Sequence, residues 1–294
     1  RHANTRVMDF NEVIIPFNAE EIVREASRCI HCPDAPCMIA CPVHNDIPSA
    51  CWYAEHREFV LAGRVFRKTN TIPEICGLVC PQEQLCQGSC VLNLTLEPVL
   101  IGAIENFVTT YERSIDREPL VPVPSSGQRV AILGAGPGGL AAAERLALAG
   151  HSVSVFDSHS EPGGLLLYGV PGFKLGPARA RTKTEELKQI GVIFVPKTTI
   201  GPDLTIDDLL AQGFDAVFIA VGAGVDTPLN IEGENLQGVY KGTDFLIRAN
   251  VDPAMLPEHK RAKPEVGETA LIIGGGDTAS DCLRTAKRLG ARKV

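Results

Sequence analysis

Two groups of cysteines in the N-terminal third of the chain have the residue type and spacing to bind metal. The first group reads Cys-x2-Cys-x4-Cys-x3-Cys-Pro and the second reads Cys-Pro-x4-Cys-x3-Cys. An iron-sulfur cluster needs several thiolates that converge on a small inorganic core, and short loops with Cys-Pro supply them. The spacing therefore predicts iron-sulfur ligands, and the candidates are Cys29, Cys32, Cys37, Cys41, Cys80, Cys86 and Cys90.

In ferredoxins with two clusters the cysteine before proline ligates the other cluster. Cys41 and Cys80 are expected to behave similarly, so that ligands are shared between the groups. Structural zinc is the main alternative, but zinc sites usually close with four ligands per group, and seven spaced thiols fit two clusters better. Disulfides are disfavoured because no export signal is present. Cys51 and Cys76 lie outside the spacing and Cys282 stands alone, so these three are expected to be buried apolar residues.

A glycine-rich loop, Gly-Ala-Gly-Pro-Gly-Gly, follows an expected strand and opens an expected helix. Its first glycine permits a tight turn, its second lets the backbone approach a pyrophosphate, and its fourth allows close helix packing. An aspartate ends the next expected strand, where it would accept hydrogen bonds from a ribose. The candidate dinucleotide-binding residues are Gly134, Ala135, Gly136, Pro137, Gly138, Gly139 and Asp157.

A second loop near the end of the chain repeats this arrangement with alanine at the third small position. Two nucleotide-binding openings in one chain suggest a flavin that exchanges electrons with a nicotinamide, because hydride transfer needs both rings face to face. The residues of this second candidate site are Gly274, Gly275, Gly276, Asp277, Thr278 and Ala279.

The elements that position these loops change type along the chain. Helices are expected over 19–26, capped by Asn18, from Asp46 to Leu61, and over 104–113. A Pro- and Ser-rich linker follows at 116–127. Beyond it, apolar β-branched runs alternate with helices, which indicates a parallel α/β domain. The expected strands cover 129–133, 152–156, 192–195, 215–221 and 269–273.

The sequence therefore predicts an α-helical iron-sulfur domain at 1–117, a Rossmann-like FAD domain at 128–266, and the start of a second Rossmann-like domain at 267–294. A length of 294 residues suits about two domains. The net charge of -7, without a Lys or Arg run, argues against a nucleic-acid partner. No apolar stretch or signal suggests a membrane or export, so a cytoplasmic protein is expected. The chain opens with Arg1 rather than Met, and both ends are expected to be trimmed.

The motifs resemble the small (beta) subunit of NADPH-dependent glutamate synthase and its relatives, which include the N-terminal part of dihydropyrimidine dehydrogenase and the large subunit of ferredoxin:NADP transhydrogenase. The resemblance covers nearly the whole chain. It rests on Arg28-Cys29-Ile30-His31-Cys32, Cys41-Pro42-Val43, Asp46-Ile47-Pro48, Asn70-Thr71-Ile72-Pro73, Cys76-Gly77-Leu78-Val79-Cys80-Pro81-Gln82-Glu83, Gly163-Gly164-Leu165, Tyr168-Gly169-Val170-Pro171 and Gly275-Gly276-Asp277-Thr278-Ala279. One departure is Leu78, where the family is expected to carry Arg.

The resemblance implies two [4Fe-4S] clusters. One would be held by Cys29, Cys32, Cys37 and Cys90, and the other by Cys41, Cys80, Cys86 and a non-cysteine ligand, for which Glu105 is the candidate. The alternative for Glu105 is a solvated glutamate at a helix start.

The same resemblance implies FAD at the first glycine loop, with Gly164 and Leu165 near the flavin and Val221 and Gly222 at the crossover between domains. NADPH would occupy the second loop, and NADH is not excluded because the discriminating residues would lie past Val294. Without the C-terminal part of such proteins, this chain is expected to bind FAD poorly and NADPH hardly at all.

By this resemblance the nicotinamide reduces FAD, and electrons then pass through the clusters to a larger catalytic subunit that carries a flavin or an iron-sulfur centre. No side chain is required as an acid or base, so no catalytic residue is predicted. Glutamate synthesis, pyrimidine reduction and electron bifurcation remain alternatives, because the partner is encoded elsewhere. The alternative from another class is a non-redox adaptor with a zinc-stabilised helical domain.

Overall fold

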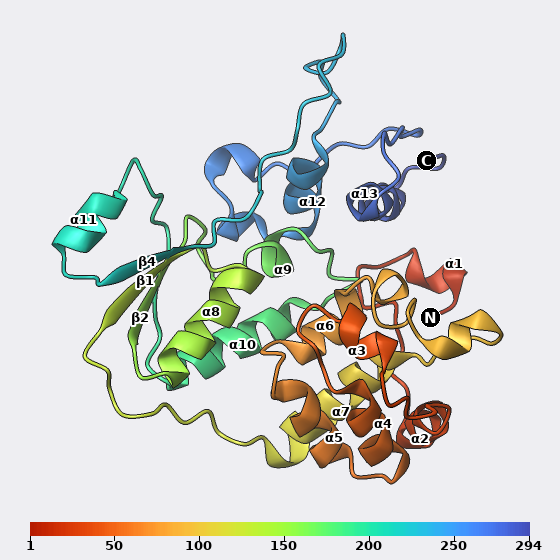
Figure 1. The fold of residues 1–294 in the computed structure, drawn as a ribbon. Helices are drawn as coiled ribbons and strands as arrows, with labels where there is room; N and C mark the ends of the chain where they lie inside the picture. The colour runs from red at the N-terminus through yellow and green to blue at the C-terminus, as the bar shows by residue number, and fades with distance from the viewer. The chain divides into compact units, whose positions relative to one another are not determined.

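The computed structural model describes residues 1–294, with the side chain of Asp116 left out of the description. The chain forms two compact units (Figure 1). The helical unit comprises Ile14–Pro119, and the sheet unit comprises Arg1–Val13 together with Leu120–Val294. The first thirteen residues therefore belong to the sheet unit, although the sequence prediction places them in the helical domain.

The helical unit packs short helices around a core that includes Ile22, Ile47, Phe66 and Ile104, each at most 2% exposed. The first of these helices carries the predicted capping box, because Asn18 and Glu21 exchange hydrogen bonds of 2.7 and 3.0 Å. The elements are α2 (Ala19–Ala26), α3 (Pro36–Ala40), α4 (Ile47–Glu55), α5 (Phe59–Arg67), α6 (Pro73–Val79), η1 (Gln82–Gln84), η2 (Val91–Leu94) and α7 (Ile101–Asp116).

The single helix predicted from Asp46 to Leu61 is wrong, because α4 ends at Glu55 and α5 begins at Phe59. The start is correct, since the Asp46 side chain accepts from the Ser49 N–H at 3.2 Å. Arg57 lies between the two helices with a φ of 66°. A residue in this left-handed region ends a right-handed helix, and the turn lets Phe59 enter the core.

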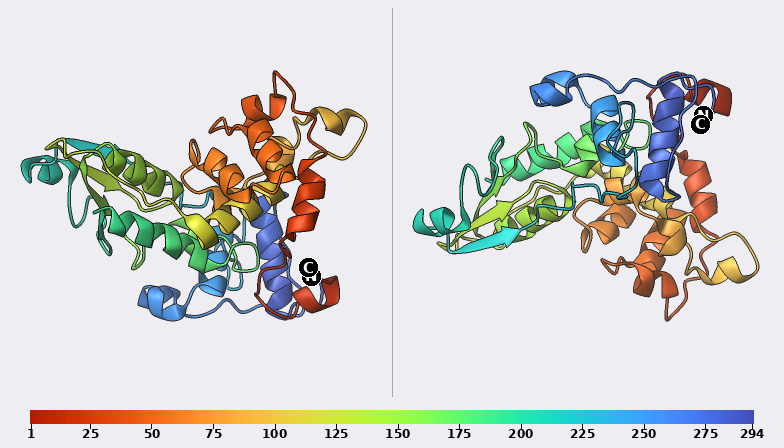
Figure 2. Two further views of the ribbon diagram at one scale, coloured as in Figure 1. Left: turned by 90° about the horizontal axis from the view of Figure 1, so that it is seen from below. Right: turned by 90° about the horizontal axis from the view of Figure 1, so that it is seen from above.

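The sheet unit contains the predicted parallel sheet, with strand order β3-β2-β1-β4. Helix α8 lies against β1 and β2, and α10 lies against α8 (Figure 2). The strands are β1 (Arg129–Leu133), β2 (Ser152–Phe156), β3 (Ile193–Val195) and β4 (Ala216–Ile219). The other elements are α1 (Ala3–Arg6), α8 (Pro137–Leu148), α9 (Leu165–Tyr168), α10 (Pro177–Gln189), α11 (Ile206–Ala211), α12 (Gly242–Asn250), η3 (Pro253–Met255), η4 (Glu258–Lys260) and α13 (Asp277–Arg288).

The strand predicted over 269–273 is wrong for the residues that the structure describes. Only Thr269 forms a bridge, which pairs it with Lys293, while Leu271 and Ile273 are 86% and 64% exposed. An apolar run becomes a strand only when neighbouring backbone accepts its ladder of hydrogen bonds. The helix predicted after the loop does form, as α13.

The N-terminal residues join the sheet unit through specific contacts. The Glu12 carboxylate accepts from the Gly176 N–H at 2.8 Å, and Val13 donates to the Phe173 carbonyl at 2.9 Å. Arg288 of α13 donates to the Asp9 carbonyl at 2.7 Å and places its guanidinium 3.9 Å from the centre of the Phe173 ring. These contacts explain why residues 1–13 separate from the helical unit. Among the described helices, none combines the length and apolar character needed to cross a membrane.

Candidate iron-sulfur and nucleotide sites

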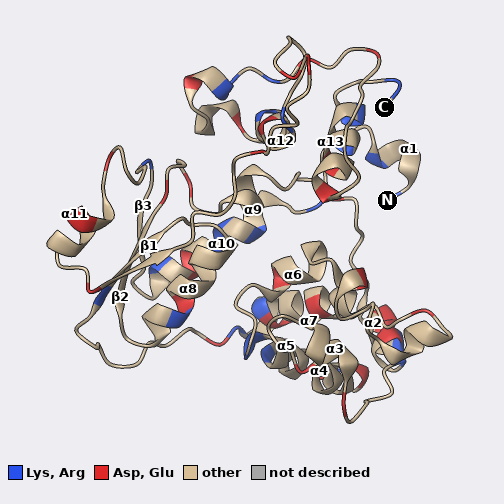
Figure 3. Ribbon diagram, turned by 45° about the horizontal axis from the view of Figure 1, so that its top comes forward, with Lys and Arg blue, Asp and Glu red and all other residues tan. Residues whose placement is uncertain are grey.

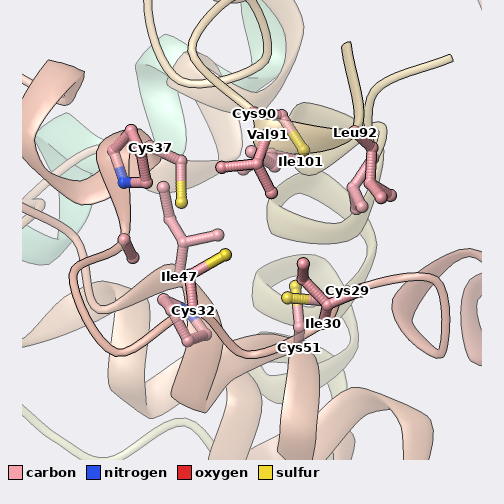
Figure 4. Close-up of a pocket in the computed structure, with 14 residues that line it drawn as sticks. Cys29, Ile30, Cys32, Cys37, Ile47, Cys51, Cys90, Val91, Leu92 and Ile101 are labelled. Carbon is pink, nitrogen blue, oxygen red and sulfur yellow. The ribbon is translucent and has the colours of Figure 1, made fainter. Parts of the chain in front are cut away.

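Five thiols of the helical unit line one cavity (Figure 4). The sulfur atoms in Figure 4 project into this common space from the loop between α2 and α3, from α3 and α4, and from the residue that precedes η2. The walls are apolar and include Ile47, Val91 and Ile101. The five thiols are Cys29, Cys32, Cys37, Cys51 and Cys90.

The thiols of this cavity influence one another electrostatically. Burial raises the pKa of Cys37 to about 11, and the nearby Cys29 and Cys90 add to the shift by charge repulsion. A hydrogen bond from Cys51 has the opposite effect, because it lowers the pKa of Cys29 to about 6. Metal ligation needs thiolates, and several thiolates in one apolar cavity need a cationic core to balance them. The cavity therefore suits a metal cluster better than free thiols.

A second group forms around the carboxylate of Glu105. Burial raises the pKa of Cys86 to about 12, and the charges of Glu105 and Cys41 contribute next. The pKa of Cys80 is raised in the same way, by burial and then by Glu105 and Cys41. The structure thus brings Cys41, Cys80 and Cys86 together beside one acidic side chain.

Glu105 is a buried residue of α7, at 6% exposure, rather than a solvated glutamate at a helix start. Its Oε1 accepts hydrogen bonds from the side-chain amides of Asn45, at 3.1 Å, and Asn70, at 2.9 Å. Burial raises the pKa of Glu105 to about 8, against the opposing effect of the two asparagines. A buried carboxylate beside three thiols is suited to bind a cation.

No three His, Cys, Asp or Glu side chains in the described part of the chain are arranged to hold one metal ion. Zinc needs four donors within about 2.0–2.3 Å of a single centre. The thiols of the first group line one shared pocket, as the members of a cluster-binding set do.

Two cysteines outside the predicted spacing lie within these groups. Cys51, fully buried on α4, lines the first cavity, and Cys76 on α6 donates to the Asn70 carboxamide oxygen at 3.8 Å. Cys76 lies on α6, four residues before Cys80, which is the C-cap of that helix. That spacing could have indicated Cys76. No local signal indicates Cys51, because α4 reaches the cavity only through tertiary packing.

The first glycine loop connects β1 to α8 and has the conformation that its glycines permit. Gly134 has a φ of 102°, and a Cβ on Gly134 would collide with the Ala220 carbonyl. A Cβ on Gly139 would collide with the Gly134 carbonyl, whereas the space beside Gly138 is open. The open side lies at the N-terminus of α8, where free N–H groups favour an anion such as a pyrophosphate.

Asp157 follows β2 and braces this loop. One carboxylate oxygen accepts from the Ala135 N–H at 2.7 Å, and the other accepts from the His159 N–H at 2.8 Å. Burial acts to raise the pKa of Asp157, but the hydrogen bonds from His159 and Ala135 outweigh it and lower the pKa. The position gives Asp157 a structural role that the motif alone does not predict.

Two further predicted segments meet the first loop. Gly163 donates to the Ala135 carbonyl at 2.9 Å, and a Cβ on Gly164 would lie 2.5 Å from the Gly136 Cα. Leu165 begins α9 and is 48% exposed. Val221 follows β4 and lies beside Gly134, and Gly222 has a φ of 70°. These segments gather at the carboxyl ends of β1 and β4, where parallel α/β sheets bind ligands.

The second glycine loop leads into α13. Gly276 is the N-cap of this helix. Gly274 has a φ of 130°, and a Cβ added to it would lie only 3.3 Å from the Cβ of Ala279. Side-chain atoms added at Gly275 or Gly276 would meet nothing within 4 Å. Asp277, Thr278 and Ala279 form the first turn of the helix. The loop thus leaves an open helix N-terminus, although its preceding strand is not formed.

A parallel α/β unit with a glycine loop at the switch point, joined to a helical unit with two thiol groups, defines a dinucleotide-binding oxidoreductase with an iron-sulfur module. Residues 128–294 match the family described as pyridine nucleotide-disulphide oxidoreductase. The chain belongs to this family. Residues 6–117 match the family described as dihydropyrimidine dehydrogenase domain II, 4Fe-4S cluster.

Individual relatives align along nearly the whole chain. The glutamate synthase [NADPH] small chain of Escherichia coli is 40% identical over 98% of this chain and 62% of its own length. AegA of Escherichia coli is 39% identical over 98% of this chain and 44% of that protein. The glutamate synthase [NADPH] small chain of Bacillus subtilis is 37% identical over 99% of this chain and 60% of that protein. The family resemblance inferred from the motifs is confirmed, and the chain spans 44–62% of these relatives.

Proposed function

We propose that this chain forms part of an oxidoreductase subunit that passes electrons between NADPH, FAD and two [4Fe-4S] clusters to a partner subunit. The observation that carries the proposal is the convergence of thiols from distant segments into two groups of the helical unit. The nucleotide-binding loop of the sheet unit supports it. The relatives named glutamate synthase [NADPH] small chain favour glutamate synthesis as the reaction.

The residues present fit two clusters. Cys29, Cys32, Cys37 and Cys90 would hold the first, and Cys41, Cys80, Cys86 and Glu105 the second. These side chains supply thiolates, one carboxylate, and apolar walls that limit water. A bound cluster supplies one-electron storage, and the chain's own contribution is to position the ligands and adjust their electrostatic surroundings.

FAD would bind in the domain that we place at 128–266. Its pyrophosphate fits the open side of the loop from Gly134 to Gly139, and Oδ2 of Asp157, which in the described part of the chain accepts only from the Ala135 N–H, retains a lone pair for a ribose hydroxyl. The backbone near Gly164, Leu165, Val221 and Gly222 would approach the flavin. No side chain is required as an acid or base, so we assign no catalytic residue.

The segment 267–294 would begin a second Rossmann-like domain, which binds NADPH or NADH. The open N-terminus of α13 supports a phosphate at residues Gly274, Gly275, Gly276, Asp277, Thr278 and Ala279.

The proposed partner is a larger catalytic subunit with its own flavin or iron-sulfur centre. A second candidate is a dihydropyrimidine dehydrogenase-type reductase, because residues 6–117 match the family model named for that enzyme's domain II. Anaerobic co-purification of the complete protein with its partner, followed by assays with glutamine plus 2-oxoglutarate and with pyrimidines, separates the two. Protein that contains zinc but neither iron nor acid-labile sulfide would overturn the proposal.

The substitution Gly164→Ala is expected to reduce the FAD content of the purified complete protein by about tenfold or more. Gly164 has a φ of 52°, and its added Cβ would overlap the Gly136 backbone. Overpacking of this kind costs about 1–3 kcal/mol, and each 1.4 kcal/mol is about tenfold in binding. The measurement is flavin absorbance per polypeptide.

Gly191→Ala is the matched control for this prediction. Gly191 also has a positive φ, of 91°, but its added Cβ would meet nothing within 4 Å, and it lies after α10 away from the loop. Both variants place an alanine at a positive φ, but only Gly164→Ala sets its Cβ against the Gly136 backbone. Equal flavin content in the two variants would contradict the proposed position of FAD.

A further inference from the structure

Two asparagines hold the Glu105 carboxylate in a way that the electron relay alone does not require. We propose that Asn45 and Asn70 are positioning residues, which occupy one oxygen of Glu105 and present the other to iron. This inference rests on the proposed second cluster and specifies how its non-cysteine ligand is prepared.

Both asparagines donate to the same oxygen of Glu105. The Nδ2 atoms of Asn45 and Asn70 lie 3.1 and 2.9 Å from Oε1. All three residues are buried, with 3%, 4% and 6% of their surface exposed. Among the described residues no hydrogen bond reaches Oε2 of Glu105. The carboxylate is therefore engaged on one side and free on the other.

The amide groups cannot turn over without losing a hydrogen bond. The Oδ1 of Asn70 accepts from the Ile72 N–H at 3.0 Å, and a backbone N–H can only donate. The Oδ1 of Asn45 accepts from the Thr69 hydroxyl at 2.7 Å. Each Nδ2 is thus directed at Glu105, and an ionised carboxylate can only accept.

Asn45 and Asn70 lie in chain segments that also lead to two proposed ligands, Cys41 and Cys80. Asn45 lies four residues after Cys41, and Asn70 lies before α6, whose C-cap is Cys80. Glu105 comes from α7, 60 and 35 residues away from its two donors. The hydrogen bonds therefore connect the carboxylate to the segments that carry Cys41 and Cys80.

Partners of this kind orient a ligand and adjust its basicity. An amide donor withdraws electron density from the carboxylate, so a cluster with this ligand accepts an electron more readily. Loss of a donor should therefore lower the reduction potential of the second cluster. Loss of an orienting partner typically weakens metal binding by about 10–100-fold.

The test compares Asn70→Leu and Asn45→Leu with Asn106→Leu in the complete protein. Asn106 is a matched control, because it is also buried, at 5% exposure, and lies on α7 next to Glu105. Its amide donates instead to the Glu74 carbonyl at 3.0 Å. The measurements are the electron paramagnetic resonance signal and midpoint potential of each cluster, and iron retention during titration with a chelator.

In Asn70→Leu and Asn45→Leu we expect the second cluster to shift to a lower potential and to lose iron at about 10–100-fold lower chelator concentration, with the first cluster unchanged. Asn106→Leu should lower thermal stability without either shift. Signals that move equally in all three variants, or in none, would overturn the positioning role.

A milder variant covers the case in which a buried leucine prevents folding. Thr69 is exposed and does not touch Glu105, so Thr69→Val removes only the hydroxyl that fixes Asn45. A smaller shift of the second cluster in the same direction is expected, and an unchanged signal in this folded variant would count against Asn45. Wild-type protein without iron would instead refute the proposed function, so the two failures are distinguishable.

Discussion

The substitution Cys37→Ala should remove one cluster and leave the other. Iron and acid-labile sulfide should then each fall from about eight to about four per chain. Cys37 lies in the first turn of α3. Its sulfur faces the same cavity as the sulfur atoms of Cys29, Cys32 and Cys90. Cys51 also lines this cavity, but it is hydrogen-bonded to Cys29, and we expect that it does not replace the missing thiolate. Iron and sulfide analysis of anaerobically purified protein measures the loss.

Cys51→Ala is the control, because Cys51 is a fully buried thiol that lines the same cavity and is not among the proposed ligands. It should keep about eight iron atoms per chain. Its hydrogen bond to Cys29 should be lost, which would change the potential of the first cluster rather than its presence. If Cys51→Ala loses as much iron as Cys37→Ala, the assignment of the first ligand set is wrong.

Local signals in the sequence predicted local structure well. The Asn18 capping box forms as expected, because it involves residues only three positions apart. The parallel sheet was predictable for a similar reason, since alternation of β-branched runs and helices reflects burial of each strand on both faces. Where structure depends on residues close in sequence, the pattern was sufficient.

The failures have a different physical origin. Arg57 ends α4 in a left-handed conformation that glycine or asparagine usually signals, and neither is present. The apolar run at 269–273 lacks a neighbouring ladder among the described residues, and no property of the run itself reveals this. The domain boundary at 1–117 stays a prediction, and the contacts of Glu12 and Asp9 with the sheet unit involve partners more than 160 residues away, which no local pattern indicates.

The candidate sites show the same division. Cysteine spacing identifies loops, but it does not show which thiols share a cavity, and it left out Cys51 and Cys76. The hydrogen bonds that hold Glu105 span 60 and 35 residues, so no motif predicts Asn45 or Asn70 as its partners. The type of ligand can thus be predicted from the sequence, whereas the residues that orient a ligand can be identified only from the folded structure.

Methionine at Arg67 is expected to lower the free energy of unfolding of the helical unit by about 3–5 kcal/mol, because it leaves buried carboxylates without their main cation. Basic residues of α5 lie next to acidic residues of α6 and α7 (Figure 3). Arg67 donates to Glu112 at 2.6 Å and to Glu74 at 3.3 Å, and the Glu112 side chain is fully buried. Denaturant titration followed by circular dichroism measures the loss.

The loss of unfolding free energy in Arg67→Met should depend on pH and become smaller in acid. Burial acts to raise the pKa of Glu74, but the charge and hydrogen bond of Arg67 outweigh it and hold the pKa below the ordinary value of 4.5. In wild type, Glu74 therefore contributes stability above about pH 4.5 that is lost as pH falls through the lowered pKa. Without Arg67 only Arg113 remains beside Glu74, at 2.7 Å, so the pKa of Glu74 rises and protonation relieves the part of its charge that is no longer balanced. The difference between wild type and Arg67→Met should shrink in acid.

Arg57→Met separates this effect from the loss of any surface charge. Arg57 pairs with Glu20 at 2.5 Å, but the two side chains are 54% and 68% exposed, so water replaces the lost interaction. Its unfolding free energy should match wild type at neutral pH. Arg67 also connects α5 to α6, which ends before Cys80, and to α7, which carries Glu105, so Arg67→Met should release iron from the second cluster before the first during unfolding. Simultaneous release of all iron, or equal stability of the two variants, would show that the buried pairs do not hold these helices together.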